Sequence, residues 1–163
     1  MSTPEQRAQE LGLEIPDYAN PPYGQRYGNL RPFHRIGNLL ELSGLTPEHR
    51  DGTLINPGVV GVDITVEQGY EAARVTGLNA LGMIRYALGS LDDVVAMSRG
   101  LCFVTCPPGF DRPHEVSNGV SDLFNDVFGR EVGAMGRASV GAAALSSNHC
   151  FELWLSLECA PRP

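Results

Sequence analysis

Two spacings of apolar residues alternate along the chain, and each predicts a different kind of element. Between residues 63 and 89, seven residues recur at intervals of three or four, namely Val66, Tyr70, Ala73, Gly77, Leu81, Ile84 and Leu88. This spacing predicts a long helix with one buried stripe. Thr65 and Gln68 have the spacing of a capping box at its start, and Gly89 is suited to its end.

Two further helices are predicted by the same reasoning. Residues 113–128 carry an apolar side and are followed by Gly129, a natural stop. Near the N-terminus, Thr3 can cap a short helix, with Pro4 at its first position and Gln6 completing a capping box. Gly12 can end this helix.

A period of two predicts the strands. Residues 30–44 predict two short strands around a turn at 37–38, and 92–106 predict a longer one. The last two strands are expected at 137–145 and 151–159. In the final strand, Phe151, Leu153, Leu155 and Leu157 point one way, and Glu152, Trp154, Ser156 and Glu158 the other. The order predicts an α+β fold with the helices on one sheet face, and Trp154 on the other face suggests an oligomer interface.

Length and composition are typical of one soluble globular domain. We expect a single domain over residues 1–163, with 1–29 as an N-terminal helix and loop extension. No apolar stretch approaches the roughly 18 residues needed to span a bilayer, and the N-terminus lacks the layout of a signal peptide. A cytoplasmic protein without membrane contact is the expectation.

Charge excludes several function classes. The formal net charge is −7, which disfavours nucleic acid as a partner. All basic residues are arginines, so a lysine Schiff base and a Walker A loop are both excluded.

The four cysteines and four histidines show no metal-binding spacing. We therefore predict no metal site, and interpret the cysteines as buried, reduced side chains.

Three polar residues are the candidates for chemistry. Arg137 and Glu152 are expected on adjacent antiparallel strands with their side chains on the same side, where Arg137 would grip a carboxylate and Glu152 would hold a water. Asn118 lies on the polar side of the second long helix. Taken one by one, each is also typical of an ordinary surface position. From the residues alone, the prediction ends at an α+β domain with a candidate site for a small carboxylate.

Five segments together resemble one known family. They are "IGNLLELSGLTP", "DITVEQGYEAARVTGLNALGMIRYALGSLDDV", "GFDRPHEVSNGVSDLFNDVFG", "GRASVGAAAL" and "FELWLSL". In this order and spacing, between about Gly37 and Leu157, they resemble the RidA/YjgF family (reactive intermediate deaminases, also called L-PSP endoribonuclease-like proteins). The resemblance is greatest to a longer-chain subgroup with an extra N-terminal helix.

The resemblance implies a fold, an assembly and an activity. The fold is chorismate-mutase-like, a curved mixed sheet with two helices on one face. Three chains form a homotrimer whose sheets close into a barrel, with ligand clefts between subunits. The activity is hydrolysis of a small enamine or imine bearing a carboxylate, to a keto compound and ammonia. No metal or organic cofactor is implied.

The resemblance also implies roles for single residues. Arg137 matches the arginine that binds the substrate carboxylate, Glu152 the glutamate associated with the hydrolytic water, and Asn118 the asparagine of the second helix. Ser43 lies in the Ser-Gly turn near the cleft.

Two positions depart from the family. Leu30 stands where the family has its site tyrosine, with Tyr23 or Tyr27 as candidates to fill that volume, and Ser139 replaces a cysteine.

Two alternatives follow from these departures. One is a trimer that binds a small carboxylate without chemistry. The other is a pathway-specific imine-handling enzyme with an altered substrate. An endoribonuclease is disfavoured by the net charge of −7.

Overall fold

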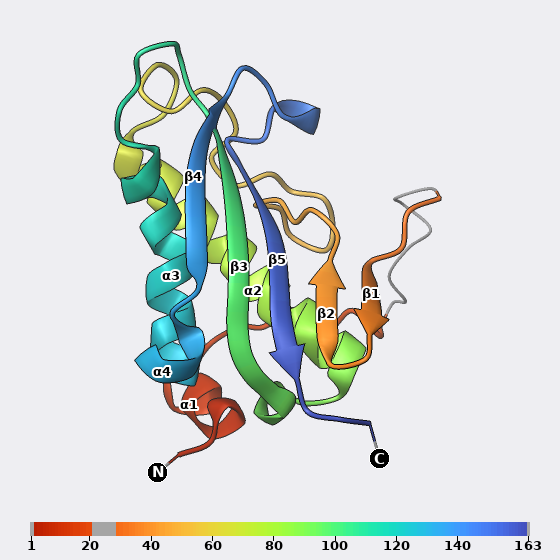
Figure 1. Cartoon of the computed structure of the whole chain (residues 1–163). Coiled ribbons are helices and arrows are strands. Elements are labelled where there is room, and N and C mark those ends of the chain that lie inside the picture. The colour runs from red at the N-terminus through yellow and green to blue at the C-terminus, as the bar shows by residue number, and fades with distance from the viewer. Residues whose placement is uncertain (1, 21–28, 163) are drawn as a thin grey trace.

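One five-stranded sheet carries its long helices on a single face, as the computed structural model shows (Figure 1). The structure describes residues 2–20 and 29–162. The elements in chain order are α1 (Pro4–Glu10), β1 (Phe33–Ile36), β2 (Leu39–Leu42), α2 (Val66–Leu88), η2 (Leu91–Asp93), β3 (Val94–Thr105), α3 (Pro113–Phe128), α4 (Arg130–Gly133), β4 (Gly136–Ala142), η3 (Ser146–Asn148) and β5 (Phe151–Cys159). The predicted α+β architecture is confirmed, while α4 was not predicted because four residues carry no readable period.

The strand order places β5 inside the sheet and β4 at its edge. The order is β1-β2-β5-β3-β4, with β3 and β4 parallel and the other neighbours antiparallel. The parallel pair needs a crossover connection, and α3 supplies it. The sheet is therefore mixed, and its two edges are formed by β1 and β4.

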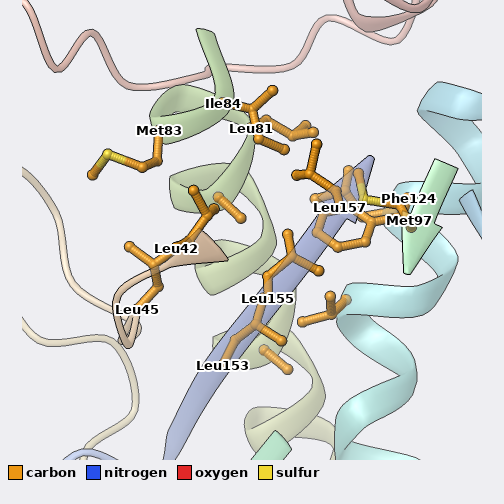
Figure 2. Packing of buried hydrophobic residues seen from close by; sticks show 14 of the residues in the cluster. Leu42, Leu45, Leu81, Met83, Ile84, Met97, Phe124, Leu153, Leu155 and Leu157 are labelled. Atoms are coloured by element: carbon orange, nitrogen blue, oxygen red, sulfur yellow. The ribbon is translucent and has the colours of Figure 1, made fainter. Parts of the chain in front are cut away.

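The two faces of β5 differ as the alternation predicts. Phe151, Leu153, Leu155 and Leu157 are at most 1% exposed. Figure 2 shows Leu153, Leu155 and Leu157 beside α2 and Phe124 of α3, where they form the centre of the core. On the other face Trp154 is 52% exposed. This second face has no helix over it (Figure 1) and is called the open face below.

Helix α2 is buried more widely than one stripe, which corrects the sequence prediction. Its buried residues include Asn79, Gly82 and Met83, all outside the predicted stripe. The chain following α1 lies against this side, since a Cβ at Gly82 would come within 2.4 Å of the Pro16 carbonyl oxygen. The spacing of apolar residues in α2 predicts one buried side of the helix, and the N-terminal segment buries a second side that this spacing does not reveal.

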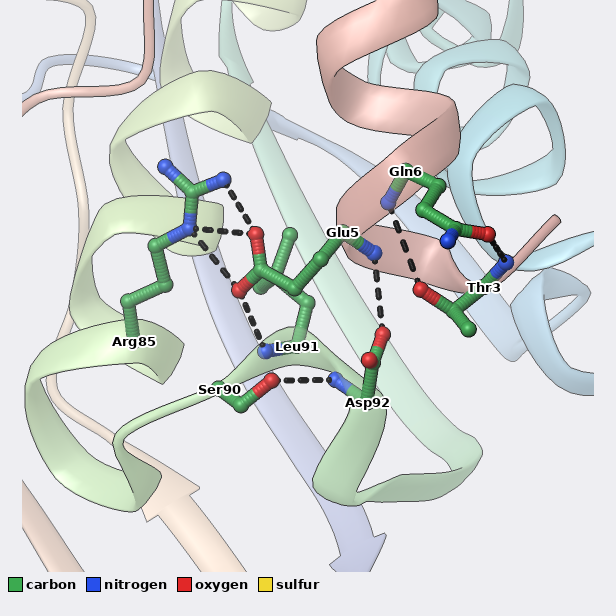
Figure 3. A network of polar contacts seen from close by, with 7 residues as sticks. All are labelled: Thr3, Glu5, Gln6, Arg85, Ser90, Leu91 and Asp92. Carbon is green, nitrogen blue, oxygen red and sulfur yellow. Dashed lines mark hydrogen bonds and ion pairs between the residues drawn. The ribbon is translucent and has the colours of Figure 1, made fainter.

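A network of polar contacts binds the N-terminal segment to α2 and η2. This segment, residues 3–20, is called the N-terminal clasp below. Figure 3 shows Glu5 between Arg85 and the backbone of Leu91. Arg85 Nε donates to both Glu5 carboxylate oxygens at 3.1 Å, and the Leu91 amide donates to Oε1 at 2.8 Å. In return, the Glu5 amide donates to Asp92 Oδ1 at 2.9 Å.

Burial by itself would raise the pKa of Glu5, but the Arg85 hydrogen bond and charge and the Leu91 amide together lower it below its ordinary value.

The cysteines are free thiols, and three of the four are buried, in line with the prediction. Burial raises the pKa of Cys102 and of Cys150 to about 11, so both are protonated at neutral pH. Cys106 is half-buried. Within residues 2–20 and 29–162, the structure contains no helix of the length and apolar character that crossing a membrane requires.

Candidate functional site

Arg137 is held against helix α3 by three hydrogen bonds. It is the second residue of β4, and its side chain is half-buried. Arg137 Nη1 donates to Asn118 Oδ1 at 3.1 Å and to Ser121 Oγ at 2.7 Å, and Nη2 donates to the His114 carbonyl at 3.2 Å. The guanidinium is thus fixed in place by neutral acceptors only.

Two of the five N–H donors of Arg137 are left without a partner among the described residues. A guanidinium carries five N–H groups, and both on Nη1 and one on Nη2 are used. The Nε donor and the second Nη2 donor have no partner among the described residues. Nε and Nη2 lie on the same edge of the guanidinium, which is the fork that binds a carboxylate bidentately. Within the described part of the chain, Arg137 forms no ion pair.

Glu152 lies on the open face of β5. Its carboxylate accepts one hydrogen bond within residues 2–20 and 29–162, from Trp154 Nε1 to Oε1 at 2.7 Å. No ion pair to Glu152 is formed there either. An ionised carboxylate has about four acceptor sites, so most of its capacity is left for a ligand or a water.

The expectation that Arg137 and Glu152 face the same side from adjacent strands is wrong. Strand β3 lies between β4 and β5, and Phe103 is paired both with Val140 and with Glu152. Paired residues share a face, and Arg137 is three positions before Val140. Arg137 therefore lies on the helix side and Glu152 on the open face.

Burial explains why the last two strands do not form a hairpin. β5 has five fully buried positions, whereas β4 has none. The more apolar strand occupies the inside of the sheet, and the more polar one its edge.

The structure brings two more predicted residues to Arg137. Asn118 accepts directly from it. Ser139 is two positions further along β4 on the same face, paired with Cys102, and its hydroxyl oxygen is buried without a hydrogen-bond partner among the described residues. These side chains form one polar group between β4 and α3, called the Arg137 cluster below.

Ser43 and Leu30 lie away from the Arg137 cluster. The Ser43 hydroxyl donates to the Arg31 carbonyl, and its amide donates to the Pro32 carbonyl at 3.0 Å. Ser43 thus fixes the entry to β1 against the end of β2. Leu30, the position where the resemblance implies a tyrosine, is 49% exposed and has no hydroxyl group. Tyr23 and Tyr27, the candidates to replace it, lie outside the described residues.

Three contributing residues were not selected as site residues from the sequence, although Trp154 was assigned to an oligomer interface. Ser121 accepts from Arg137, Trp154 donates to Glu152, and Gly44 lies against both Glu152 and Trp154. A signal existed for Ser121, which follows Asn118 by three positions and so shares its helix face. The period-two pattern likewise places Trp154 beside Glu152. Within residues 2–20 and 29–162, no group of three or more His, Cys, Asp or Glu side chains is arranged to hold a metal ion.

A comparison with known proteins adds the family. Residues 5–155 match the family described as "YjgF/chorismate mutase-like, putative endoribonuclease". The chain belongs to the YjgF/RidA family. Its fold is accordingly the YjgF/chorismate-mutase-like α+β fold, as the resemblance implied.

Relatives of this YjgF/RidA protein cover nearly its whole length. It is 36% identical over 145 residues to Protein TCP17 of Trypanosoma cruzi, covering 89% of this chain and 87% of the relative. A protein of unknown function from Agrobacterium tumefaciens is 34% identical with a TM-score of 0.83, covering 96% of this chain and 92% of that one. A "putative endoribonuclease" from Shewanella oneidensis is 29% identical with a TM-score of 0.86, covering 96% and 99%.

Proposed function

We propose that this protein hydrolyses a small imine or enamine bearing a carboxylate, giving a keto compound and ammonia. The observation that carries the proposal is that Arg137 is a fixed cation with two unused N–H donors and no anionic partner among the described residues. A half-buried guanidinium without an anionic partner is stabilised by binding an anion, and a carboxylate matches the planar arrangement of guanidinium N–H donors. Family membership supports the same reaction class.

Glu152 has the properties that the hydrolytic step needs. Its carboxylate is on the open face, and one oxygen is free of partners in the described part of the chain. In the proposed reaction, Glu152 takes a proton from a water while the water oxygen attacks the imine carbon. The nitrogen of the tetrahedral adduct receives that proton and then the hydroxyl proton, which the same carboxylate relays, so that the C–N bond breaks and ammonia leaves as the carbonyl forms. An enamine enters the same path after protonation at carbon.

The opposite orientation of Arg137 and Glu152 favours a shared site between subunits. Within one chain the two side chains lie on different sides of the sheet, so a single copy does not present both to one ligand. In the proposed homotrimer, the open faces turn inward as a barrel and each cleft takes Arg137 from one subunit and Glu152 from a neighbour. The apolar side chains on the open face, which include Phe103, Val140 and Trp154, support burial against another copy.

One observation favours the alternative of binding without turnover. Leu30 replaces the family tyrosine and removes a hydroxyl from the site. In that case Arg137 still binds a small carboxylate, and no ammonia forms. A pathway-specific imine-handling enzyme with an altered substrate is the third outcome, since Leu30 also changes the shape of the site.

The test follows ammonia and pyruvate released from freshly generated 2-iminopropanoate. We expect Arg137→Ala to lower kcat/KM about 100-fold, because charge-assisted hydrogen bonds to the substrate are lost. Arg74→Ala is the matched control, since Arg74 forms a surface ion pair with Asp126 on the helices. Its rate should equal that of the wild type.

The result separates the alternatives. A wild-type rate at the uncatalysed level, together with calorimetric binding of pyruvate that Arg137→Ala abolishes, would replace hydrolysis by binding. Turnover only with larger imines would indicate the pathway-specific enzyme. Sedimentation equilibrium tests the trimer directly, and a monomer at all concentrations would contradict the shared cleft.

A further inference from the structure

The carboxylate of Glu152 accepts a hydrogen bond from Trp154, and this bond can fix its orientation. Glu152 and Trp154 are two residues apart on β5 and so share the open face. The 2.7 Å bond from Trp154 Nε1 to Glu152 Oε1 is the sole hydrogen bond to this carboxylate from the described residues. Among the described residues, Trp154 is therefore the only hydrogen-bond donor that can orient this carboxylate.

Gly44 encloses this hydrogen bond from the side. A Cβ at Gly44 would lie 2.3 Å from Glu152 Oε1 and 2.9 Å from Trp154 Nε1, well inside contact distance. The backbone at 44 cannot move away easily, because Leu45 and Leu153 exchange two backbone hydrogen bonds of 2.9 and 2.8 Å. The glycine is thus needed for space at the Glu152–Trp154 pair.

Phe103 holds the indole from the neighbouring strand. Its ring meets that of Trp154 edge to face, with centroids 5.7 Å apart and planes at 65°. Such aromatic pairs are mutually attractive beyond the area they bury. Although Trp154 is 52% exposed, its indole is therefore restrained by Phe103 on β3 and by the Gly44 backbone.

We propose that Trp154 is the positioning residue of Glu152. Its indole N–H fixes Oε1, so Oε2 is directed toward the water that attacks the imine carbon. The catalytic part of this assignment rests on the proposed hydrolysis, whereas the hydrogen bond itself does not. A freely rotating carboxylate spends only part of its time aligned with the water, and alignment contributes to rate rather than to substrate binding.

A kinetic experiment tests the positioning role. Trp154→Phe keeps an aromatic ring against Phe103 but lacks the N–H donor. We expect kcat to fall about tenfold, because the Glu152 carboxylate loses the hydrogen bond that orients it for the attack by water. KM should stay within twofold of the wild-type value, because this hydrogen bond does not contact the substrate. Glu158→Gln, on the same face of β5 but without a bond to the indole, is the control and should keep the wild-type kcat. A Trp154→Phe variant with kcat within twofold of the wild type overturns the proposal.

A spectroscopic experiment tests the hydrogen bond without any turnover. Trp154 is the one tryptophan of the chain, so its fluorescence reports this position alone. Glu152→Ala should shift the emission maximum by several nanometres, whereas Glu158→Ala, on the same face of β5 but without a bond to the indole, should leave it unchanged. An unchanged maximum in Glu152→Ala overturns the positioning role. If the wild type turns over no imine while Glu152→Ala shifts the emission, the hydrolysis proposal fails and the hydrogen bond stands.

Discussion

The two faces of β5 differ in whether the charged side chains near them have a partner of opposite charge. On the helix-covered side, Glu5 forms an ion pair with Arg85, and the Glu48 carboxylate lies against His149. On the open face, Glu152 has one neutral donor and no ion partner among the described residues. Arg137 is an exception on the helix side, because on the edge strand β4 it has only neutral partners among the described residues.

The difference distinguishes structural charges from available ones. A charge that holds the fold together is satisfied by its own chain, because leaving it unpaired costs stability. A charge that serves a ligand has to keep part of its capacity free. In β5 the covered face carries no charged side chain, whereas Glu152 on the open face is charged and keeps free acceptor sites. Free acceptor capacity marks Glu152 as a candidate site residue more clearly than its exposure does, since Glu152 is only half-exposed.

The largest effect is expected from shortening an apolar side chain on the covered face. Leu155 is 1% exposed, so Leu155→Ala should lower the free energy of unfolding by about 2–5 kcal/mol through lost burial and a cavity. Urea denaturation measures this. Glu158→Gln, on the open face of the same strand, should stay within about 0.5 kcal/mol. Equal losses in the two variants would remove the distinction between the faces.

A smaller loss is expected from a buried histidine that contacts a carboxylate just before β5. His149 is 3% exposed, and its Nε2 lies 3.5 Å from Glu48 Oε2. His149→Ala should lower the free energy of unfolding by about 2–3 kcal/mol, because it removes a partner of a largely buried carboxylate. The control is His34→Ala, since His34 is exposed on β1. A thermal melt that shows the same midpoint for both variants would contradict a structural role for the pair.

The N-terminal clasp should add a pH-dependent contribution. The pKa of Glu5 is lower in the folded chain than its ordinary value of 4.5, so its stabilisation is present above that value and is lost as pH falls through the folded pKa. At pH 7, Glu5→Gln should cost about 1 kcal/mol. The difference between Glu5→Gln and the wild type should shrink steadily below pH 4.5 in urea titrations.

The control for the clasp is Glu14→Gln, which changes an exposed carboxylate of the same segment. It should show no such pH dependence. A Glu5→Gln difference that grows on acidification would mean that the Arg85 contact is not what stabilises the clasp.

The smallest loss of stability, with a change at the site, is expected for Gly44→Ala. The new methyl group meets the ends of the Glu152 and Trp154 side chains, which can rotate away, so unfolding should change by less than about 1 kcal/mol. The Trp154 emission should nevertheless shift, and imine hydrolysis should fall about tenfold. Added to Glu152→Ala, the substitution should lower activity no further. A fully additive loss would show that Gly44 acts elsewhere.

Most of the fold was predictable because its signals are local. The capping boxes at Thr3 and Thr65 and the stop at Gly89 are all present in the structure. The alternation in β5 correctly divided its residues between two faces. What failed was non-local, namely the second buried side of α2 and the strand order. Both depend on which distant segment competes best for an apolar surface, and no window of the sequence contains that information.

The candidate site was predicted in its parts but not in its geometry. Arg137 and Asn118 were selected, and they do interact. The error was to treat the last two strands as a hairpin, which put Arg137 and Glu152 on one side. Strand β3 lies between β4 and β5, and the register of the two pairings puts Arg137 and Glu152 on opposite faces of the sheet. The number of residues between Arg137 and Glu152 does not contain this register, so the sequence spacing could not predict the faces.

The N-terminal clasp also constrains the order of events during synthesis. Its amide at Glu5 bonds to Asp92, which is 87 residues further along the chain. The clasp leaves the ribosome before α2 and η2, so it has no surface to bind until these two elements have followed it. At a typical 5–20 residues per second, this delay is on the order of 4–17 seconds. The clasp is made before the helix that it covers, and its docking has to wait for that helix.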